Sequence, residues 1–494
     1  MRSEIRFLRR GRTVRLADAS PTLTLLDYLR LEERATGTKE GCAEGDCGAC
    51  TVVLRRARGD RIVYEPVNAC IMLAGQADGA EVITVEDLAD GETLHPVQHS
   101  LVEQHGSQCG FCTPGFVMAM FALYHAPGPR PLARKQVNDW LAGNLCRCTG
   151  YRPIVDAALA SCAGAPADRF ARHEEEARRT LAKLTDNDDL FVGTPERFFA
   201  APATLASLGK LYAQYPDATL VAGATDVGLW ITKALRDLPR IIWLGRVRGL
   251  DVIDDGRDAL SLGACVTHVT ATPYLAKLDP DLGELMRRFA GTQIRTTGTV
   301  GGNIANGSPI GDLPPALIAL GATVALQHGE EPRTLPLENF FIAYRKQDRR
   351  EGEFVRMVRI PRLVANEQFR CFKVSKRFDE DISAVMGAFK LRLEGPRIAG
   401  ARIAYGGMAE IPKRARATER ALIGVKLDKP ETWEAAVAAL AQDFKPIDDQ
   451  RASARYRLDA AQAILRKALT ELGGASTQET RIVGRRESAD VGAA

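Results

Sequence analysis

Apolar and polar residues alternate in two short segments near the N-terminus. Residues 5–8 and 13–16 follow this period of two on either side of Gly11, and the arrangement predicts a β-hairpin. Residues 22–30 have the pattern of a short helix, and the apolar run at residues 50–54 predicts a strand. The chain is therefore predicted to begin with a small domain of strands and turns.

The pattern becomes mainly helical from about residue 80 to residue 162, with Pro and Gly at the breaks. Residues 163–190 carry many charges and few apolar anchors, which is typical of a solvated, partly helical linker. From residue 191 the pattern is mixed α/β, and the composition changes again near residue 365. Strands are predicted at residues 219–222, 240–244, 261–264, 383–393 and 397–405, and helices at 430–443 and 448–472. The polar tail from residue 475 is predicted to be disordered.

The composition limits the class of protein. A length of 494 residues suits about three domains, and a net charge of +4 is too small to argue for nucleic acid binding. The first seventeen residues lack the apolar segment of a secretory signal. The longest apolar stretch, residues 316–326, is shorter than a membrane span. With no export signal, we expect reduced cysteines and a cytoplasmic location, without a membrane partner.

Eight cysteines form two different patterns. The first cysteine set is Cys42, Cys47, Cys50 and Cys70. Its spacing, C-x4-C-x2-C with a fourth cysteine 20 positions on, is that of a plant-type [2Fe–2S] ferredoxin. Four thiolates also suit tetrahedral zinc, but zinc sites usually have a close C-x2-C pair at both ends. The glycines of residues 41–50 leave backbone N–H groups uncovered for hydrogen bonds to sulfur, so iron–sulfur is favoured over zinc.

The second cysteine set is Cys109, Cys112, Cys146 and Cys148. Its pattern, C-x2-C followed by C-x-C, favours iron–sulfur less strongly than the first spacing does, and zinc stays open. Thr113 is predicted to cap a helix, with Pro114 in its first turn. Cys109 and Cys112 would then precede a helix N-terminus, where the positive end of the dipole favours thiolate.

Two glycine-rich loops, residues 220–228 and 298–312, lie in the mixed α/β part. Backbone N–H groups in such loops can bind a pyrophosphate, and Thr225, Thr299 and Ser308 add hydroxyl donors. Neither loop is a dinucleotide fingerprint or a Walker loop, and each alone is more typical of a tight turn. Together with two sites for one-electron carriers they favour a flavin nucleotide, because flavin handles both one and two electrons.

The segments 38–42, 106–115, 144–151 and 301–305 together resemble the xanthine dehydrogenase family of molybdenum hydroxylases. Within that family, the chain is most similar to the small subunit of the bacterial two-subunit xanthine dehydrogenase type, over nearly its whole length. The resemblance implies an α+β multidomain protein. The implied parts are a β-grasp ferredoxin domain at 1–78, a four-helix-type [2Fe–2S] domain at 79–162, a linker at 163–190, a vanillyl-alcohol-oxidase-type FAD-binding domain at 191–365, an α+β C-terminal flavoprotein domain at 366–474 and a disordered tail at 475–494.

The resemblance also implies site residues. Each cysteine set would bind one [2Fe–2S] cluster. The implied FAD contacts are Leu220, Val221, Ala222, Gly223, Ala224, Thr225, Asp226, Val227, Phe289, Thr299, Val300, Gly301, Gly302, Asn303, Asp312, Val355 and Lys373. Phe289 would lie along the isoalloxazine, although a core phenylalanine fits equally well. Ala224 stands where a glycine is frequent, and Val355 where a leucine is common.

Tyr344 and Asp379, the first residue of the acidic run 379–381, match positions near the family's NAD site. A solvated acidic turn fits that run too. Gln108 would face the pterin of a partner subunit.

The resemblance implies a role in electron transfer, with no catalytic residue for purine hydroxylation in this chain. A partner subunit would hold molybdopterin, within a heterotetramer of two small and two large subunits. Electrons from oxidation of hypoxanthine to xanthine, and of xanthine to urate, would reach NAD⁺ through both clusters and FAD. The alternative is the same role in an aldehyde or other N-heterocycle hydroxylase. A self-contained NADH-oxidising reductase and a zinc-stabilised scaffold are rival classes.

Overall fold

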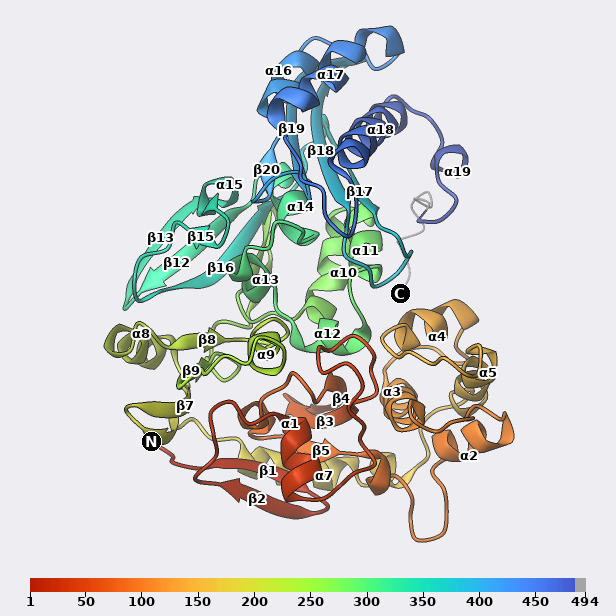
Figure 1. The fold of residues 1–494 in the computed structure, drawn as a ribbon, viewed down its shortest axis with the longest axis vertical. Helices are drawn as coiled ribbons and strands as arrows, with labels where there is room; N and C mark the ends of the chain where they lie inside the picture. Colours follow the sequence, from red (N-terminus) through yellow and green to blue (C-terminus); the bar gives the residue numbers. More distant parts are fainter. Residues whose placement is uncertain (485–494) are drawn as a thin grey trace. The chain divides into compact units, whose positions relative to one another are not determined.

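The computed structural model describes residues 1–484 and divides into two compact units. Unit 1 consists of Met1–Gly249 and Ala290–Gly298, and unit 2 of Leu250–Phe289 and the residues from Thr299 onward. Figure 1 shows both as mixtures of helices and sheets, as predicted for an α+β protein. Among the described residues no helix is long and apolar enough to cross a membrane.

Unit 1 begins with a five-stranded sheet in the order β2-β1-β5-β3-β4. Its strands are β1 (Ile5–Arg9), β2 (Arg12–Leu16), β3 (Thr51–Arg58), β4 (Arg61–Asn68) and β5 (Glu81–Ile83). Thr24 caps the short helix α1 (Leu25–Asp27), which continues into a π-helical turn at Tyr28–Glu32. Leu25 and Leu29 pack with Phe7 and Val52 in one core. The hairpin and the short helix therefore lie where the sequence predicts them.

A helical part follows, made of α2 (Pro96–Glu103), α3 (Thr113–His125), α4 (Arg134–Leu141) and α5 (Arg152–Ser161). Helix α3 is apolar on all sides and ten of its residues are buried, because the other helices and β3 pack around it. The expected linker contains α6 (Arg169–Arg172) and α7 (Glu174–Leu184). It is partly helical as predicted, but Phe170 and Leu181 are buried, so it is anchored as well as solvated.

The rest of unit 1 is a second sheet in the order β6-β7-β9-β8 with three helices. These elements are β6 (Leu190–Thr194), β7 (Arg197–Ala201), α8 (Leu205–Gln214), β8 (Thr219–Val221), α9 (Val227–Thr232), β9 (Arg240–Trp243) and α12 (Thr292–Thr297). β7 and β8 both pair with β9 in parallel. The first glycine-rich loop therefore connects a strand to a helix, as the sequence predicts.

Unit 2 has two larger antiparallel sheets and one two-stranded sheet. The first has the order β10-β11-β16-β12-β13, from β10 (Ile253–Asp255), β11 (Ala259–Gly263), β12 (Thr323–His328), β13 (Glu331–Pro336) and β16 (Glu353–Pro361). The second has the order β17-β18-β19-β20, from β17 (Glu367–Val374), β18 (Val385–Glu394), β19 (Arg397–Gly406) and β20 (Lys413–Arg414). β14 (Phe341–Ala343) pairs with β15 (Lys346–Gln347).

The helices of unit 2 cover these sheets (Figure 1). They are α10 (His268–Leu278), α11 (Pro280–Arg287), α13 (Val300–Asn306), α14 (Leu313–Leu320), α15 (Leu337–Phe340), α16 (Arg416–Leu422), α17 (Glu434–Asp443), α18 (Ala454–Leu472) and α19 (Thr477–Thr480). Helix α18 packs on β17 and β18, and α14 packs on β18 and β19. Apolar residues of this sheet and of α17 and α18 form one core.

Three local predictions need correction. Cys112, not Thr113, is the N-cap of α3, because the Thr113 hydroxyl is hydrogen-bonded to Ser107 (2.7 Å). Much of the second glycine-rich segment is helical, since α13 begins at Val300. The start of the expected disordered tail is ordered, with α19 and a buried Arg481. The rest of that tail lies outside the described residues.

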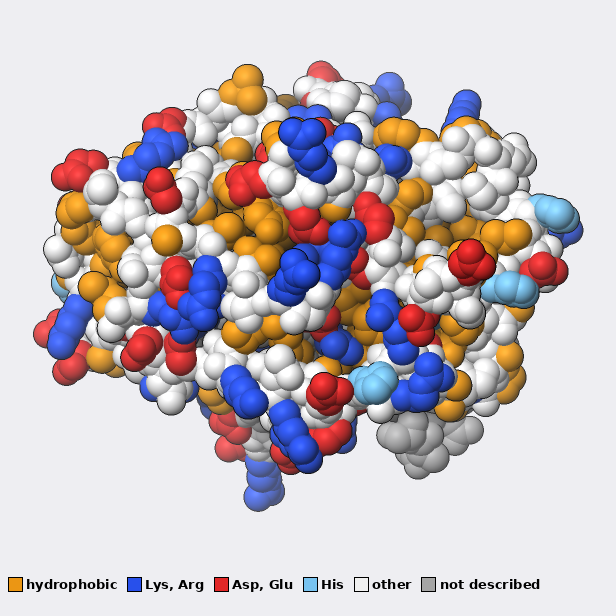
Figure 2. Space-filling view, turned by 90° about the horizontal axis from the view of Figure 1, so that it is seen from below, with side chains coloured by type: hydrophobic (Ala, Val, Ile, Leu, Met, Phe, Trp, Pro, Cys, Tyr) orange, Lys and Arg blue, Asp and Glu red, His pale blue; other side chains and the backbone are white. Residues whose placement is uncertain are grey.

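The surface carries both signs of charge. Figure 2 shows Lys and Arg interspersed with Asp and Glu on one face, with hydrophobic side chains between them. The mixture on this face agrees with the small net charge.

Candidate iron–sulfur and flavin sites

The first cysteine set comes together in unit 1. Cys42, Cys47 and Cys50 lie in the loop before β3, and Cys70 follows β4. The Sγ atoms of Cys50 and Cys70 are 3.3 Å apart, and the N–H of Cys47 donates to Sγ of Cys42 (3.3 Å). Cys42 also contacts the thiols of Cys47 and Cys70. The four sulfurs therefore form one continuous group, in which Cys42 contacts Cys47 and Cys70, and Cys70 also contacts Cys50.

The charges of these thiols are linked. Hydrogen bonds from the thiols of Cys47 and Cys70 hold the pKa of Cys42 far below its usual range. The same contact with Cys42 raises the pKa of Cys47 and of Cys70. A thiolate at Cys42 therefore disfavours ionisation of the neighbouring thiols. A cationic centre bound by all four sulfurs would remove this opposition, because metal ligation favours the thiolate.

Glycine shapes the loop around these sulfurs. A Cβ on Gly41 would lie 2.8 Å from Sγ of Cys47, so only glycine leaves the sulfur its place. The N–H groups of Glu44 and Cys47 point at Cys42, and that of Gly45 at Cys70. Such donors suit the anionic sulfur of an iron–sulfur cluster, and four gathered thiols are the ligand set of a [2Fe–2S] centre.

The second cysteine set lies at two helix starts, as predicted. Cys109 and Cys112 precede α3, and Cys146 and Cys148 precede α5. Side-chain contacts pair Cys109 with Cys148 and Cys112 with Cys146. Burial, with the Cys146 contact, raises the pKa of Cys112 to about 12, whereas Cys109 is exposed and backbone hydrogen bonding at Phe111 lowers its pKa. Cys112 and Cys146 are thus half-buried, whereas Cys109 and Cys148 are exposed.

Tyr151 holds the second half of this set. Its φ of 70° is unusual for a residue with a side chain and turns the chain into α5. Its hydroxyl accepts a hydrogen bond from the N–H of Cys146 (3.1 Å). The thiol of Cys146 also lies 3.2 Å from the Thr149 hydroxyl. The C-x-C segment is therefore fixed by its own neighbours.

The predicted flavin residues fall on both units. In unit 1, Gly223 lies so close to the 290–298 segment that a Cβ would be 2.1 Å from the carbonyl oxygen of Thr297. Ala224 next to it has φ of 63° and is buried. This conformation gives a physical reason for the glycine that is frequent at this position, because a left-handed backbone disfavours alanine relative to glycine.

In unit 2, Thr299 caps α13 by accepting a hydrogen bond from the N–H of Gly302 (3.0 Å). Among residues 1–484, the side-chain oxygen of Asn303 is one of the buried polar atoms without a hydrogen-bond partner. A buried acceptor of this kind usually has a partner, so it fits a ligand with donor groups. The residues at this segment are thus compatible with a bound flavin nucleotide.

Lys373 and Asp312 form a buried ion pair in unit 2, and the Ser383 hydroxyl donates to the other carboxylate oxygen of Asp312. Phe289 is half-buried, with its ring centroid 4.8 Å from that of His268. Val355 is buried in β16. Lys373 and Asp312 are therefore brought together.

The predicted NAD residues are more exposed. Tyr344 is 55% exposed, and the Arg345 guanidinium lies over its ring. Asp379 pairs with Arg287 (3.4 Å), and Asp381 accepts hydrogen bonds from its own loop, so the acidic run is partly neutralised. Gln108 is exposed.

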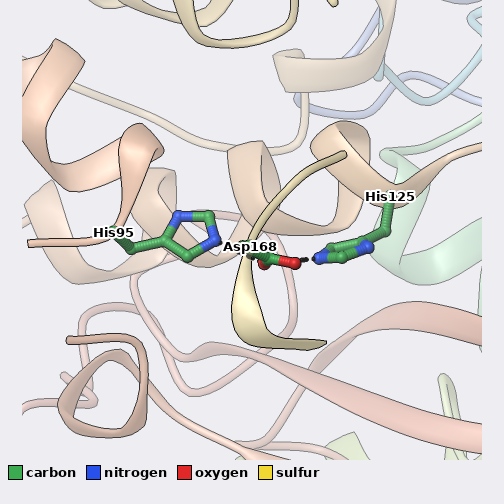
Figure 3. A group of neighbouring side chains, drawn as sticks. All are labelled: His95, His125 and Asp168. Carbon is green, nitrogen blue, oxygen red and sulfur yellow. Dashed lines mark hydrogen bonds and ion pairs between the residues drawn. The ribbon is translucent and has the colours of Figure 1, made fainter. Parts of the chain in front are cut away.

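One buried cluster has no counterpart among the predicted sites (Figure 3). Nε2 of His95 and Nε2 of His125 lie 2.7 and 2.9 Å from the same oxygen of Asp168. The three ligand atoms lie within 4.8 Å of one another, a spacing that also suits a metal ion. Nδ1 of His95, however, accepts the N–H of Val97 (3.2 Å), which leaves the ring proton on Nε2. A metal would need that nitrogen free, so hydrogen bonding explains the cluster better.

Comparison with known proteins identifies the domains. Four family models match, described as 2Fe-2S iron-sulfur cluster binding domain (residues 8–75), [2Fe-2S] binding domain (84–159), FAD binding domain in molybdopterin dehydrogenase (195–363) and CO dehydrogenase flavoprotein C-terminal domain (370–472). The chain belongs to the molybdenum hydroxylase family, as one of its iron–sulfur and FAD-binding chains. The recognition, the fold class and the two kinds of cofactor domain predicted from the sequence are thereby confirmed.

Xanthine dehydrogenase 1 of Arabidopsis thaliana is 33% identical over 84% of this chain, and xanthine dehydrogenase/oxidase of Rattus norvegicus is 32% identical over 82%. The chain spans only 36% and 34% of these relatives. Among solved structures, carbon monoxide dehydrogenase from Hydrogenophaga pseudoflava matches with a TM-score of 0.53 and 26% identity, covering 57% of this chain and 100% of that chain. Quinoline 2-oxidoreductase from Pseudomonas putida 86 matches with a TM-score of 0.52 and 27% identity, covering 57% of this chain and 98% of that chain.

Proposed function

We propose that this chain is the electron-transfer subunit of a xanthine dehydrogenase. Relatives with that name align along most of the chain, at about one third identity. In this proposal the first and second cysteine sets each bind one [2Fe–2S] cluster. The proposed domain boundaries are those given by the sequence, except that residues 475–484 belong to the ordered part of unit 2.

FAD is proposed to contact the loop 220–227, the segment 299–303, Phe289, Asp312, Val355 and Lys373. When bound, the clusters carry single electrons and FAD takes up two, which joins a two-electron substrate oxidation to reduction of NAD⁺. The chain's own residues bind and orient these groups. Lys373 and Asp312 form their ion pair in a buried place, which fixes both side chains before a cofactor arrives. Asn303 supplies an acceptor that is already desolvated.

The proposal of a partner subunit rests on the exposed half of the second cysteine set. Cys109 and Cys148 are exposed. Around them lie three large side chains that are also exposed, Phe111 (48%), Leu145 (40%) and Tyr151 (40%). Apolar groups gathered at a redox site suit a protein partner that covers them. We propose that a molybdopterin-binding subunit covers this side, in a heterotetramer of two small and two large subunits, and that Gln108 faces the pterin.

NAD⁺ is proposed as the acceptor, with Tyr344 and Asp379 near its site. The partner would oxidise hypoxanthine to xanthine and xanthine to urate. A second candidate keeps the electron-transfer role and changes the substrate to an aldehyde or another N-heterocycle. The similarity to quinoline 2-oxidoreductase and to carbon monoxide dehydrogenase supports this second candidate, because enzymes with other substrates share the fold.

The test is co-expression with a candidate molybdopterin-binding subunit from the same source and purification of the complex. Anaerobic mixing with xanthine should bleach the flavin spectrum and produce signals of two reduced clusters, and NAD⁺ should then be reduced. Bleaching by quinoline or an aldehyde but not by purines would select the second candidate. A colourless protein with zinc in place of iron would contradict both.

A further inference from the structure

The two cysteine sets touch each other through the backbone next to their ligands. The N–H of Leu145 donates to the carbonyl oxygen of Cys47 (3.0 Å). The side-chain amide of Asn144 donates to the carbonyl oxygen of Gly48 (3.0 Å). Leu145 immediately precedes Cys146. A single backbone hydrogen bond therefore joins Cys47 of the first set to the residue next to Cys146 of the second.

Glycines bring the backbones close together at this contact. A Cβ on Gly48 would lie 2.2 Å from the carbonyl oxygen of Gly143, and a Cβ on Gly115 would lie 2.2 Å from that of Gly48. These distances are far below van der Waals contact with backbone atoms that cannot move aside. The two ligand loops therefore lie too close together for a side chain at Gly48 or Gly115.

Gln293 on α12 joins both loops. Its Nε2 donates to Oδ1 of Asn144 (2.8 Å) and to the hydroxyl of Thr51 (3.0 Å), next to Cys50. The Thr51 hydroxyl donates in turn to the carbonyl oxygen of Gly48 (2.6 Å). The two acceptors use both amide protons of Gln293, and they fix which way the amide points. Gln293, Asn144 and Thr51 are all at most 3% exposed.

This glutamine comes from a distant part of the sequence. It follows Asn144 by 149 residues and Thr51 by 242, and it lies inside the FAD-binding domain match. Thr292 beside it donates to the carbonyl oxygen of Trp140 (3.0 Å), so α12 is attached to the helical part at two places. In a buried neutral network, removing one donor leaves its acceptors unsatisfied and weakens the contacts that they support.

We propose that Gln293 is a positioning residue that fixes the separation of the two iron–sulfur clusters. A residue of the FAD-binding domain would thereby set a distance inside the iron–sulfur part, and the cluster spacing would depend on α12 being in place. The inference rests on the proposed assignment of both cysteine sets as cluster ligands.

The experiment compares the magnetic interaction of the two reduced clusters in the full chain. In fully reduced protein, low-temperature EPR should show splitting of each cluster signal by the other, because dipolar coupling falls with the cube of their separation. Gln293→Leu should keep the iron content and both signals of the parent but change or lose the splitting. Gln214→Leu, at an exposed glutamine of α8, is the matched control and should leave the splitting unchanged.

An unaltered splitting in Gln293→Leu with normal iron content would overturn the inference. If that variant loses iron, Gln293→Asn supplies the same comparison, since it keeps the amide but shortens its reach. Absence of [2Fe–2S] signals in the unmodified protein would instead count against the cluster assignment itself, so the two failures are distinguishable.

Discussion

Asp168 offers the sharpest test of how the segment after the second cysteine set is held. One carboxylate oxygen accepts hydrogen bonds from His95 and His125, and the other accepts the N–H of Ala171 as the N-cap of α6. Asp168→Ala removes the cap, which costs about 1 kcal/mol, and leaves two buried imidazole N–H groups without an acceptor, at about 1 kcal/mol or more each. The sum is about 3 kcal/mol, which lowers the melting temperature of a unit of this size by roughly 6–12 °C.

The assay is thermal unfolding of the holoprotein, read from the loss of the cluster absorbance of unit 1. Asp237→Ala is the control. Asp237 forms an exposed ion pair with Arg197, and such a pair contributes at most about 1 kcal/mol. If Asp168→Ala melts within the range of this control, the hydrogen-bonded cluster does not stabilise unit 1 and the reasoning is wrong.

The pH dependence of this difference has a definite sign. Burial opposes ionisation of Asp168, but hydrogen bonds from His125 and His95 outweigh it and hold the pKa of Asp168 well below its usual value. A carboxylate with a depressed folded-state pKa contributes stability above its unfolded pKa, about 3.9, and loses it as the pH falls toward the folded value. The melting difference between parent and Asp168→Ala should therefore shrink only below about pH 4.

Three further outcomes are expected. Cys146→Ser should reduce iron from about four to about two per chain and remove one of two EPR signals, whereas loss of all iron would contradict two separate centres. Ala224→Gly should raise thermal stability, by up to about 1 kcal/mol, because it relieves a left-handed backbone; a lower melting temperature would contradict this. Asn303→Leu should lower FAD content at normal iron content, and an unchanged flavin-to-protein ratio would exclude a contact there.

Local features of the sequence were sufficient for much of the fold and the sites. The spacing of Cys42, Cys47 and Cys50 lies within one loop, so it defines a ligand group without knowledge of the tertiary structure. The helix cap predicted at Thr113 was wrong, because the Thr113 hydroxyl forms a hydrogen bond with Ser107. The sequence does not show which of several possible partners a hydroxyl will bind. The prediction that the tail is disordered from residue 475 failed for a similar reason. Polar composition suggested disorder, but Arg481 is ordered by ion pairs with two buried carboxylates.

The features that the sequence did not reveal all depend on distant partners. His95 and Asp168 are 73 residues apart, and Thr51 and Gln293 are 242 apart. Histidine, threonine and glutamine at such separations carry no spacing rule, unlike cysteines in a metal-binding loop. Only the folded chain shows that these residues share one place.

Arg481 also bears on how this protein should be handled in the laboratory. Its guanidinium neutralises two buried carboxylates, those of Asp281 and Glu471. Shortening the gene after residue 475, a natural choice for a crystallographer who regards the polar end as dispensable, would delete that positive charge from the interior of unit 2. A useful boundary for expression therefore lies beyond Gly484, not before α19.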